Sequence, residues 1–288
     1  MRDFEFLEPA SVQEASRMLA DLGDDCRAIA GGTALMLGMR QRMLTPTHLV
    51  SLGQLHDLRH ISFDAQSGLS IGALALHHDI ARSPQVQAHA PLLASMASRL
   101  ANPQVRNQGT LGGNLCYADP ATDPPGCLMA LNAQVVLQSA HGERVLAIED
   151  FLIDYYTTAL APDELLTHIR IPPSATGTIG LYTRFLRTPA EHRPLASIAL
   201  LAQRSGAVCT GARLAVGAST AVALRIPRAE AFLNGKTITP DVAREAAEIV
   251  ATDIDPISDA RGNADYRRDM VRIVARRTIC QLFDLQAS

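Results

Sequence analysis

Two pairs of adjacent glycines constrain this chain more than any other feature, because each pair lies at a turn next to a helix-forming segment. Gly31-Gly32 follows the short apolar run 27–30 and is itself followed by helix formers from Leu35. Gly112-Gly113 lies in the turn 109–114, whose sequence is Gly-Thr-Leu-Gly-Gly-Asn. Turns of this kind present backbone N–H groups and the positive end of a helix dipole. Glycine allows an anion to approach them closely.

Taken singly, a Gly-Gly turn before a helix is more often only a turn. Neither segment has the Gly-Lys-Ser/Thr ending of an ATP-binding P-loop or the spacing of the dinucleotide fingerprint. Two such turns in one chain nevertheless suit a diphosphate, whose two charged groups each need donors. Thr33 adds a hydroxyl donor to the first turn.

An acidic segment follows the second turn and contains Asp119 and Asp123. A carboxylate here accepts hydrogen bonds from hydroxyls or from a ring N–H, but it does not help to bind phosphate. The alternative is turn formation before a helix that starts near Pro124. We favour the turn for Asp119, and both interpretations stay open for Asp123.

The pattern of apolar residues predicts an opening unit of helix, strand, turn, helix and strand, which favours a parallel α/β arrangement. Its expected ranges are 11–22, 27–30, 35–43 and 47–52. Further helices are predicted at 90–101, 124–131, 228–233, 241–251 and 265–283. Further strands are predicted at 135–138, 144–148, 181–186, 197–202 and 213–216. The segment 172–177, Pro-Pro-Ser-Ala-Thr-Gly, is the best linker candidate.

Composition excludes several classes of partner and site. The formal net charge of −3 and the absence of Trp give no reason to expect nucleic acid or an anionic membrane surface. Acidic residues near the start and short apolar runs argue against a signal peptide or a membrane span, so we expect a cytoplasmic protein. The five cysteines include no Cys-x-x-Cys pair, so an iron–sulfur cluster or zinc ribbon is not expected here.

Other polar clusters are interpreted as surface. The pair His56 and His60 and the cluster 77–79, His-His-Asp, lack the partners that a metal site needs, so no metal is expected. No Gly-x-Ser-x-Gly elbow occurs, and no catalytic residue is assigned. The last helix carries an arginine stripe, interpreted as a solvated face or, less favoured, a docking surface. Its members are Arg268, Arg272 and Arg276, with Arg267 and Arg277 beside them.

The order and spacing of motifs along the whole chain resemble the FAD-binding medium subunit of the molybdenum hydroxylases. This family includes xanthine dehydrogenases, carbon monoxide dehydrogenase and N-heterocycle dehydrogenases. The resemblance is carried by the two glycine turns and the acidic segment. It is also carried by the segments 150–160, 164–166, 169–172, 258–262 and 266–268.

The resemblance implies an α+β fold with two domains. The first, at 1–175, is an FAD-binding domain of the vanillyl-alcohol-oxidase-like (PCMH) type, with subdomains of roughly 1–55 and 56–175. The second, at 177–288, is a smaller α+β domain of the carbon monoxide dehydrogenase flavoprotein type.

The resemblance also implies the residues that bind FAD. Asp123 carries the carboxylate that contacts the flavin, Leu100 lies beside the adenine, and a backbone contact to the ring system is expected near Leu165. Arg184 stands where the family often has Lys, and His192 stands where some relatives place an aromatic residue over the flavin, although a surface loop histidine is at least as good an interpretation. The two phosphate loops fall on Ala28, Ile29, Ala30, Gly31, Gly32, Thr33, Ala34 and Leu35, and on Thr110, Leu111, Gly112, Gly113 and Asn114.

The function implied is electron transfer within a complex. A large partner subunit carries the molybdenum cofactor, a small partner carries two [2Fe–2S] clusters, and this chain passes electrons through FAD to an external acceptor. A dimer of heterotrimers is expected. The first alternative is a self-sufficient flavin oxidoreductase of the same fold, and the second is a scaffold whose glycine loops are empty.

Overall fold

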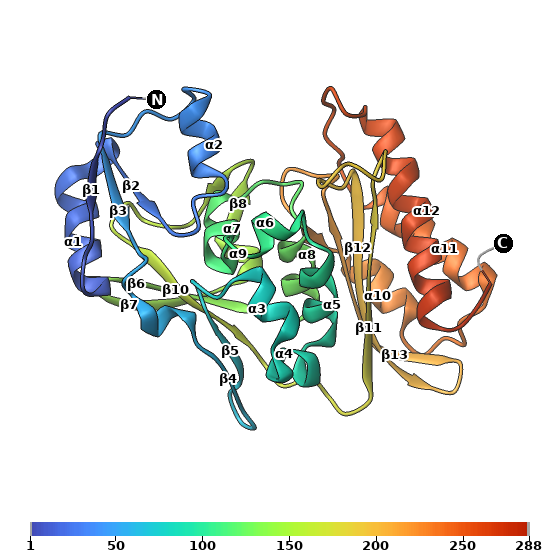
Figure 1. Cartoon of the computed structure of the whole chain (residues 1–288). Coiled ribbons are helices and arrows are strands. Elements are labelled where there is room, and N and C mark those ends of the chain that lie inside the picture. Colours follow the sequence, from blue (N-terminus) through green and yellow to red (C-terminus); the bar gives the residue numbers. More distant parts are fainter. Residues whose placement is uncertain (1, 287–288) are drawn as a thin grey trace.

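The amino-terminal part of the chain forms a small parallel sheet with one long helix against it (Figure 1). The computed structural model describes residues 2–286. The helix is capped by Ser11, whose hydroxyl oxygen accepts from the Glu14 N–H at 3.1 Å. The predicted parallel arrangement is confirmed. The elements are β1 (Glu5–Leu7), α1 (Val12–Leu22), η1 (Gly23–Asp25), β2 (Cys26–Ile29), α2 (Leu35–Arg40) and β3 (His48–Ser51), with strand order β1-β3-β2.

The middle of the chain forms an antiparallel sheet with several short helices packed against it (Figure 1). The strands run in the order β4 (Ile61–Asp64), β5 (Gly68–Gly72), β10 (Leu165–Ile171), β6 (Gln134–Ser139) and β7 (Gly142–Ala147). The other elements are η2 (His56–Arg59), α3 (His77–Arg82), α4 (Pro84–His89), α5 (Pro91–Arg99), α6 (Pro103–Arg106), α7 (Leu111–Tyr117), α8 (Pro124–Ala130), α9 (Ile148–Phe151), β8 (Leu152–Asp154) and β9 (Thr157–Thr158).

The carboxy-terminal part is a second antiparallel sheet with helices along one face (Figure 1). The predicted strands at 197–202 and 213–216 are the buried portions of longer strands, because the exposed polar tips pair with each other in a hairpin. The elements are β11 (Thr178–Phe185), β12 (Ala196–Ser205), β13 (Val208–Gly217), β14 (Leu224–Arg225), α10 (Pro227–Leu233), α11 (Pro240–Thr252) and α12 (Ala264–Leu282).

Strand β12 is buried on both faces, and its side chains point alternately into the two halves of the molecule. Ala199 and Leu201 pack into the core of the middle region. Ile198 and Leu200 pack into the core formed with the carboxy-terminal helices. Since successive strand residues point to opposite faces, the sheet is shared between two apolar cores. The contact between the two halves is therefore apolar.

The predicted solvated face of the last helix is wrong for Arg267, whose side chain is 1% exposed. Its guanidinium pairs with Asp259 at 2.7 Å and donates to the carbonyl oxygen of Ala218 at 2.8 Å. The neighbouring Arg268 and Arg272 do lie at the surface, where they pair with acidic residues of α11 and α12. Arg267 is therefore a structural residue of the carboxy-terminal region.

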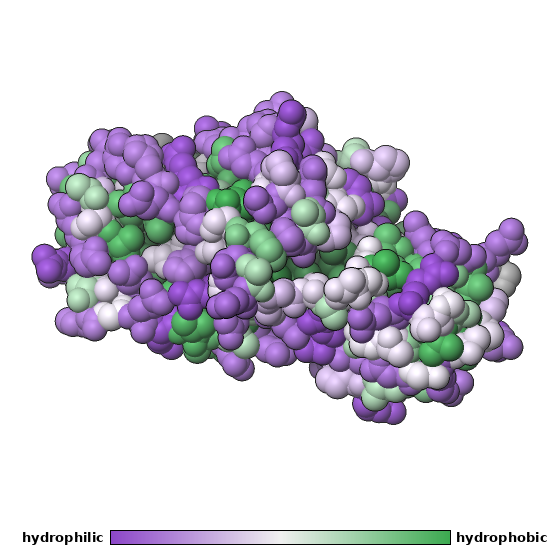
Figure 2. Space-filling view, turned by 90° about the horizontal axis from the view of Figure 1, so that it is seen from below, coloured by the Kyte–Doolittle hydropathy of each residue, from purple (hydrophilic) through white to green (hydrophobic). Residues whose placement is uncertain are grey.

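The molecular surface is mixed in character. On the face shown in Figure 2, hydrophobic residues occur in separate patches among hydrophilic ones. Among the helices in residues 2–286, none combines the length and hydrophobicity that a bilayer crossing requires.

Candidate functional site

The two glycine turns, about 80 residues apart in sequence, lie directly against each other. A Cβ on Gly31 would overlap the carbonyl oxygen of Gln108 and stand 3.0 Å from the Cα of Gly109. A Cβ on Gly113 would stand 3.7 Å from the Cβ of Ala30. The turns therefore form one site, made by the end of β2 and the start of α7.

The glycines in this site have different reasons to be glycine. Gly31 and Gly112 are needed for packing, because a Cβ on Gly112 would stand 2.5 Å from the Cβ of Ala73. Gly32 has a φ of +68°, in the left-handed region that favours glycine. Only Gly113 is exposed at the site, where it leaves the surface of α7 bare. The sequence suggested close approach of an anion at all four, and of these only Gly113 leaves an exposed, side-chain-free surface.

Free backbone donors are concentrated in the first turn. Within residues 2–286, the N–H groups of residues 31–35 make no hydrogen bond. In the second turn the N–H groups of residues 111–114 are all paired: Gly112 donates to Ala73 at 2.9 Å, and Gly113 donates to the Thr110 hydroxyl at 3.1 Å. A diphosphate fits here, with donors from residues 31–35 and a side-chain-free surface at Gly113. Two phosphate cradles would require free donors in both turns, but the structure has them only in the first.

Asp123 lies at the junction with the carboxy-terminal sheet and is 3% exposed. Its carboxylate accepts from the Tyr182 hydroxyl and from the Arg184 guanidinium, the latter at 3.1 Å. Arg184 also donates to the carbonyl oxygen of Arg99 at 2.6 Å, and Arg99 donates to that of Tyr182 at 3.0 Å. These side chains are called the Asp123 cluster below. The cluster joins α5 and α8 to β11.

The second glycine turn is tied to the segment that precedes Asp123. The side-chain amide of Asn114 donates to the hydroxyl oxygen of Thr122 at 2.7 Å, and the hydroxyl donates back at 3.1 Å. Asp119 forms the turn expected for it, accepting from the Ala121 N–H at 2.9 Å. It also pairs with Arg193 at 2.6 Å. The glycine turns and the Asp123 cluster are thus connected through one short stretch of chain.

The protonation of the Asp123 cluster follows from its burial. Burial raises the pKa of Asp123, while the Arg184 charge and the Tyr182 hydrogen bond act in the opposite direction. Burial and the Asp123 charge raise the pKa of Tyr182 well above its ordinary value. Tyr182 therefore stays protonated and donates a hydrogen bond to Asp123, whose carboxylate accepts from both Tyr182 and Arg184.

Replacing Tyr182 with Phe is expected to lower the free energy of unfolding by about 1–3 kcal/mol, because it removes a donor from a buried carboxylate. The loss grows with pH. The pKa of Asp123 is raised in the folded state, so the free energy of unfolding falls as pH rises from the unfolded-state pKa of this carboxyl through its folded-state pKa. The substitution raises the folded-state pKa further and so increases this fall. Denaturant unfolding at about pH 4 and about pH 8 measures this. Tyr155→Phe, at an exposed tyrosine, is the control; equal deficits at both pH values would contradict the expectation.

The remaining predicted residues lie in different surroundings. Leu165 packs in the same small core as Val50 and Leu74, against which Ala28 and Ala30 also pack. The side chain of Leu100 is buried in the larger core, and its carbonyl oxygen accepts from Arg106 at 2.8 Å. His192 is exposed in the loop between β11 and β12. The structure brings the two turns and Leu165 together, and separately joins Asp123 to Arg184.

Tyr182 and Arg99 were not singled out in the sequence, and the surface interpretation is wrong for His77. Tyr182 lies two residues before Arg184 in a strand, so period-2 alternation was a signal that both face the same side. The side chain of His77 is 2% exposed and lies beside Gly109. Its spacing from Ile80 on one helix face was a signal of burial.

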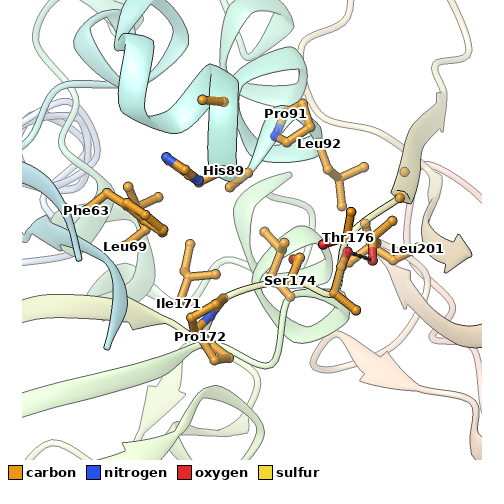
Figure 3. Close-up of a pocket in the computed structure, with 18 residues that line it drawn as sticks. Phe63, Leu69, His89, Pro91, Leu92, Ile171, Pro172, Ser174, Thr176 and Leu201 are labelled. Carbon is orange, nitrogen blue, oxygen red and sulfur yellow. Dashed lines mark hydrogen bonds between the residues drawn. The ribbon is translucent and has the colours of Figure 1, made fainter. Parts of the chain in front are cut away.

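A separate cavity of about 230 Å³ lies where the linker 172–177 passes between the two halves (Figure 3). Phe63 and His89 stack at one wall, with ring centroids 3.4 Å apart, and Leu92 and Leu201 line the other side. The cavity includes no residue of the glycine turns or of the Asp123 cluster. Its volume is also below the usual range for small-molecule sites, so it is not a dinucleotide site.

Metal-binding clusters are absent from residues 2–286, in the sense of three or more His, Cys, Asp or Glu side chains placed to hold an ion. The ring nitrogens of His60 contact the carbonyl oxygen of Asp57 at 2.8 Å and the hydroxyl of Ser70 at 3.0 Å. These contacts account for His60 without a metal.

Known proteins match this chain along nearly its whole length. Residues 2–174 match the family described as the FAD binding domain in molybdopterin dehydrogenase, and residues 182–282 match the carbon monoxide dehydrogenase flavoprotein C-terminal domain. The nicotine 6-hydroxylase medium subunit of Paenarthrobacter nicotinovorans is 34% identical, and the alignment covers 96% of each chain. The carbon monoxide dehydrogenase medium chain of Hydrogenophaga pseudoflava is also 34% identical, with the same coverage.

A solved structure gives the same result. In the carbon monoxide dehydrogenase from Hydrogenophaga pseudoflava that lacks the Mo-pyranopterin moiety of its cofactor, the matching chain superposes with a TM-score of 0.94. The two chains are 35% identical, and the match covers 98% of each.

Proposed function

Since this chain belongs to the family of FAD-binding medium subunits of the molybdenum hydroxylases, we propose that it carries electrons through one FAD held between its two glycine turns. The resemblance found in the sequence is confirmed, and so is the expected fold class. The protein is an oxidoreductase subunit. The observation that carries the proposal is the contact between the two turns, which combines five free N–H groups with an uncovered glycine surface.

The proposed contacts divide along an extended cofactor. The diphosphate lies against the two turns, the Asp123 carboxylate and the Arg184 guanidinium contact the flavin end, and Leu165 offers backbone to the ring system. Leu100 is proposed on the adenine side, where its buried side chain also packs in the larger core. The full set comprises Ala28, Ile29, Ala30, Gly31, Gly32, Thr33, Ala34, Leu35, Leu100, Thr110, Leu111, Gly112, Gly113, Asn114, Asp123, Leu165 and Arg184.

The protein residues position the cofactor and set its surroundings. When bound, FAD supplies the redox chemistry, and no side chain of this subunit needs to react. The free N–H groups of residues 31–35 hold the negative charge of the diphosphate. Asp123 is held ready by Tyr182 and Arg184, so its carboxylate needs little reorganisation when a ring N–H or a hydroxyl comes within reach.

The proposed complex supplies the remaining centres. A large partner subunit carries the molybdenum cofactor, and a small partner carries two [2Fe–2S] clusters that deliver electrons to FAD. An external acceptor then removes the electrons, and a dimer of heterotrimers is the proposed assembly. Within this chain we propose an FAD-binding domain at 1–175, with subdomains of roughly 1–55 and 56–175, and a second domain at 177–288.

Purification of the chain with the products of neighbouring genes tests this function. We expect a coloured complex with about one FAD per chain, together with molybdenum and iron on the partners. A complex that holds no FAD per chain would overturn the proposal, and FAD on the chain without any molybdenum partner would favour the self-sufficient oxidoreductase. Reduction of the flavin by substrate only when all subunits are present would support electron transfer between them.

A further inference from the structure

One buried histidine at the junction of the two glycine turns has a ring nitrogen without a partner among the described residues. His77 is the first residue of α3, and its backbone N–H donates to the carbonyl oxygen of Gly109 at 3.1 Å. The preceding residue, Leu76, forms a β-bridge with Thr110. The side chain of His77 is therefore fixed against the second turn by the backbone on either side of it.

The ring of His77 has an unused hydrogen-bonding atom. Its Nδ1 is buried and has no partner among the described residues. Buried polar atoms in native proteins are nearly always paired, so an orphan at a ligand site indicates a partner that binds there. Burial lowers the pKa of His77 to about 4, so the ring is neutral near pH 7 and holds one N–H.

The position of the ring relates this atom to both turns. A Cβ on Gly109 would stand 2.8 Å from the Val105 carbonyl oxygen, 3.3 Å from the His77 Cδ2 and 3.5 Å from the Thr33 hydroxyl oxygen. One edge of the imidazole thus faces the place where the first and second turns meet. Nε2 is bonded to Cδ2 at that edge, and a half-turn about the Cβ–Cγ bond exchanges Cδ2 with Nδ1. A ring nitrogen lies near this edge in either orientation.

We propose that His77 is a further FAD contact, donating a ring N–H to a phosphate oxygen of the diphosphate held between the two turns. The inference rests on the proposed function and adds a second side-chain donor, beside the Thr33 hydroxyl, to the backbone N–H groups of the site. The hydroxyl of Thr33, on the opposite turn, faces the same place. A diphosphate is the matching ligand chemistry because it presents several acceptor oxygens to donors on two sides.

Binding of FAD and of ADP to the full chain, freed of flavin, tests the role of His77. In His77→Leu we expect the Kd for both ligands to rise at least about tenfold, since a hydrogen bond to a charged acceptor is lost. His77→Asn keeps a donor close to the ring position and is expected to retain most of the affinity. His78→Gln, at the next residue of the same helix, is the matched control and should bind as the parent chain does.

The thermal unfolding midpoint of the ligand-free chain separates this role from a structural one. His77→Leu replaces an unpartnered polar ring by an apolar side chain, so the midpoint should stay the same or rise. A lower midpoint in His77→Leu would assign the residue to the fold and overturn the inference. Unchanged binding of FAD and ADP by His77→Leu would also overturn the inference and would indicate that water is the partner of the ring nitrogen. Failure of the parent chain to bind FAD would instead refute the proposed function.

Discussion

Replacing Gly113 with leucine is expected to remove flavin from the purified chain while the chain stays folded. The glycine is exposed at the site, and a Cβ there would point toward Ala30 of the opposite turn at 3.7 Å. A leucine side chain would fill the space between the turns, where the diphosphate is proposed to lie. We expect the affinity for FAD to fall by about a hundredfold or more, which corresponds to about 3 kcal/mol.

The substitution has a predictable effect on the fold. A Cβ on Gly113 would stand 2.7 Å from the Thr110 hydroxyl oxygen, which caps α7, so the cap must rotate. Loss of this cap costs about 1 kcal/mol, and the helix propensity of leucine over glycine returns a similar amount. The thermal midpoint should therefore change little.

Flavin content by absorbance and the unfolding midpoint of the same preparation check this result. Thr239→Ala is the control, because it removes an equivalent cap from α11 and lies outside the proposed site. If Thr239→Ala lost flavin as completely as Gly113→Leu, the loss would come from lowered stability and not from the filled space between the turns. Full flavin content in Gly113→Leu would show that the turns do not hold the cofactor.

Local signals in the sequence predicted the parts of this fold that depend on local order. The apolar run before Gly31 and the capping pattern at Ser11 sufficed to predict the opening parallel unit. The structure brings the two glycine pairs against each other, but the sequence did not reveal the reason for each glycine. Gly31 and Gly112 are dictated by backbone and side chains from distant segments, Gln108 and Ala73, which no local pattern reveals.

Long-range contacts account for what the sequence did not predict. The central strand β10 was not assigned, because its polar residues interrupt the apolar pattern although the strand is paired on both sides. Asp123 could be interpreted as turn or ligand, and only the fold shows that it is buried against Tyr182 and Arg184. The unpaired N–H groups of residues 31–35 likewise become visible only when every other partner is in place.

Arg267 shows the same limit most clearly, and its substitution is expected to have the largest effect on stability. In the sequence it is one of several arginines on the last helix, yet its side chain is 1% exposed. It pairs with Asp259 and donates to carbonyl oxygens of Ala218, Leu195 and Gly262. Arg267→Met removes these donors together and leaves a partly buried carboxylate and carbonyl groups unpaired. We expect the free energy of unfolding to fall by about 3–5 kcal/mol.

Denaturant unfolding of the full chain measures this loss, with Arg268→Met as the matched control. Arg268 is the next residue of the same helix. Its pair with Asp265 is long, at 3.5 Å, and Asp265 is exposed, so loss of the pair should cost less than about 1 kcal/mol. Burial acts to raise the pKa of Asp259, but hydrogen bonds from Arg267 and two backbone N–H groups leave it lowered. The stabilisation from Asp259 is therefore present above its unfolded pKa and is lost as pH falls through its folded pKa. The difference in free energy of unfolding between the parent chain and Arg267→Met should therefore shrink in acid. A small difference at neutral pH would show that the Asp259 pair does not stabilise this region. A difference as large at low pH as at neutral pH would show the same.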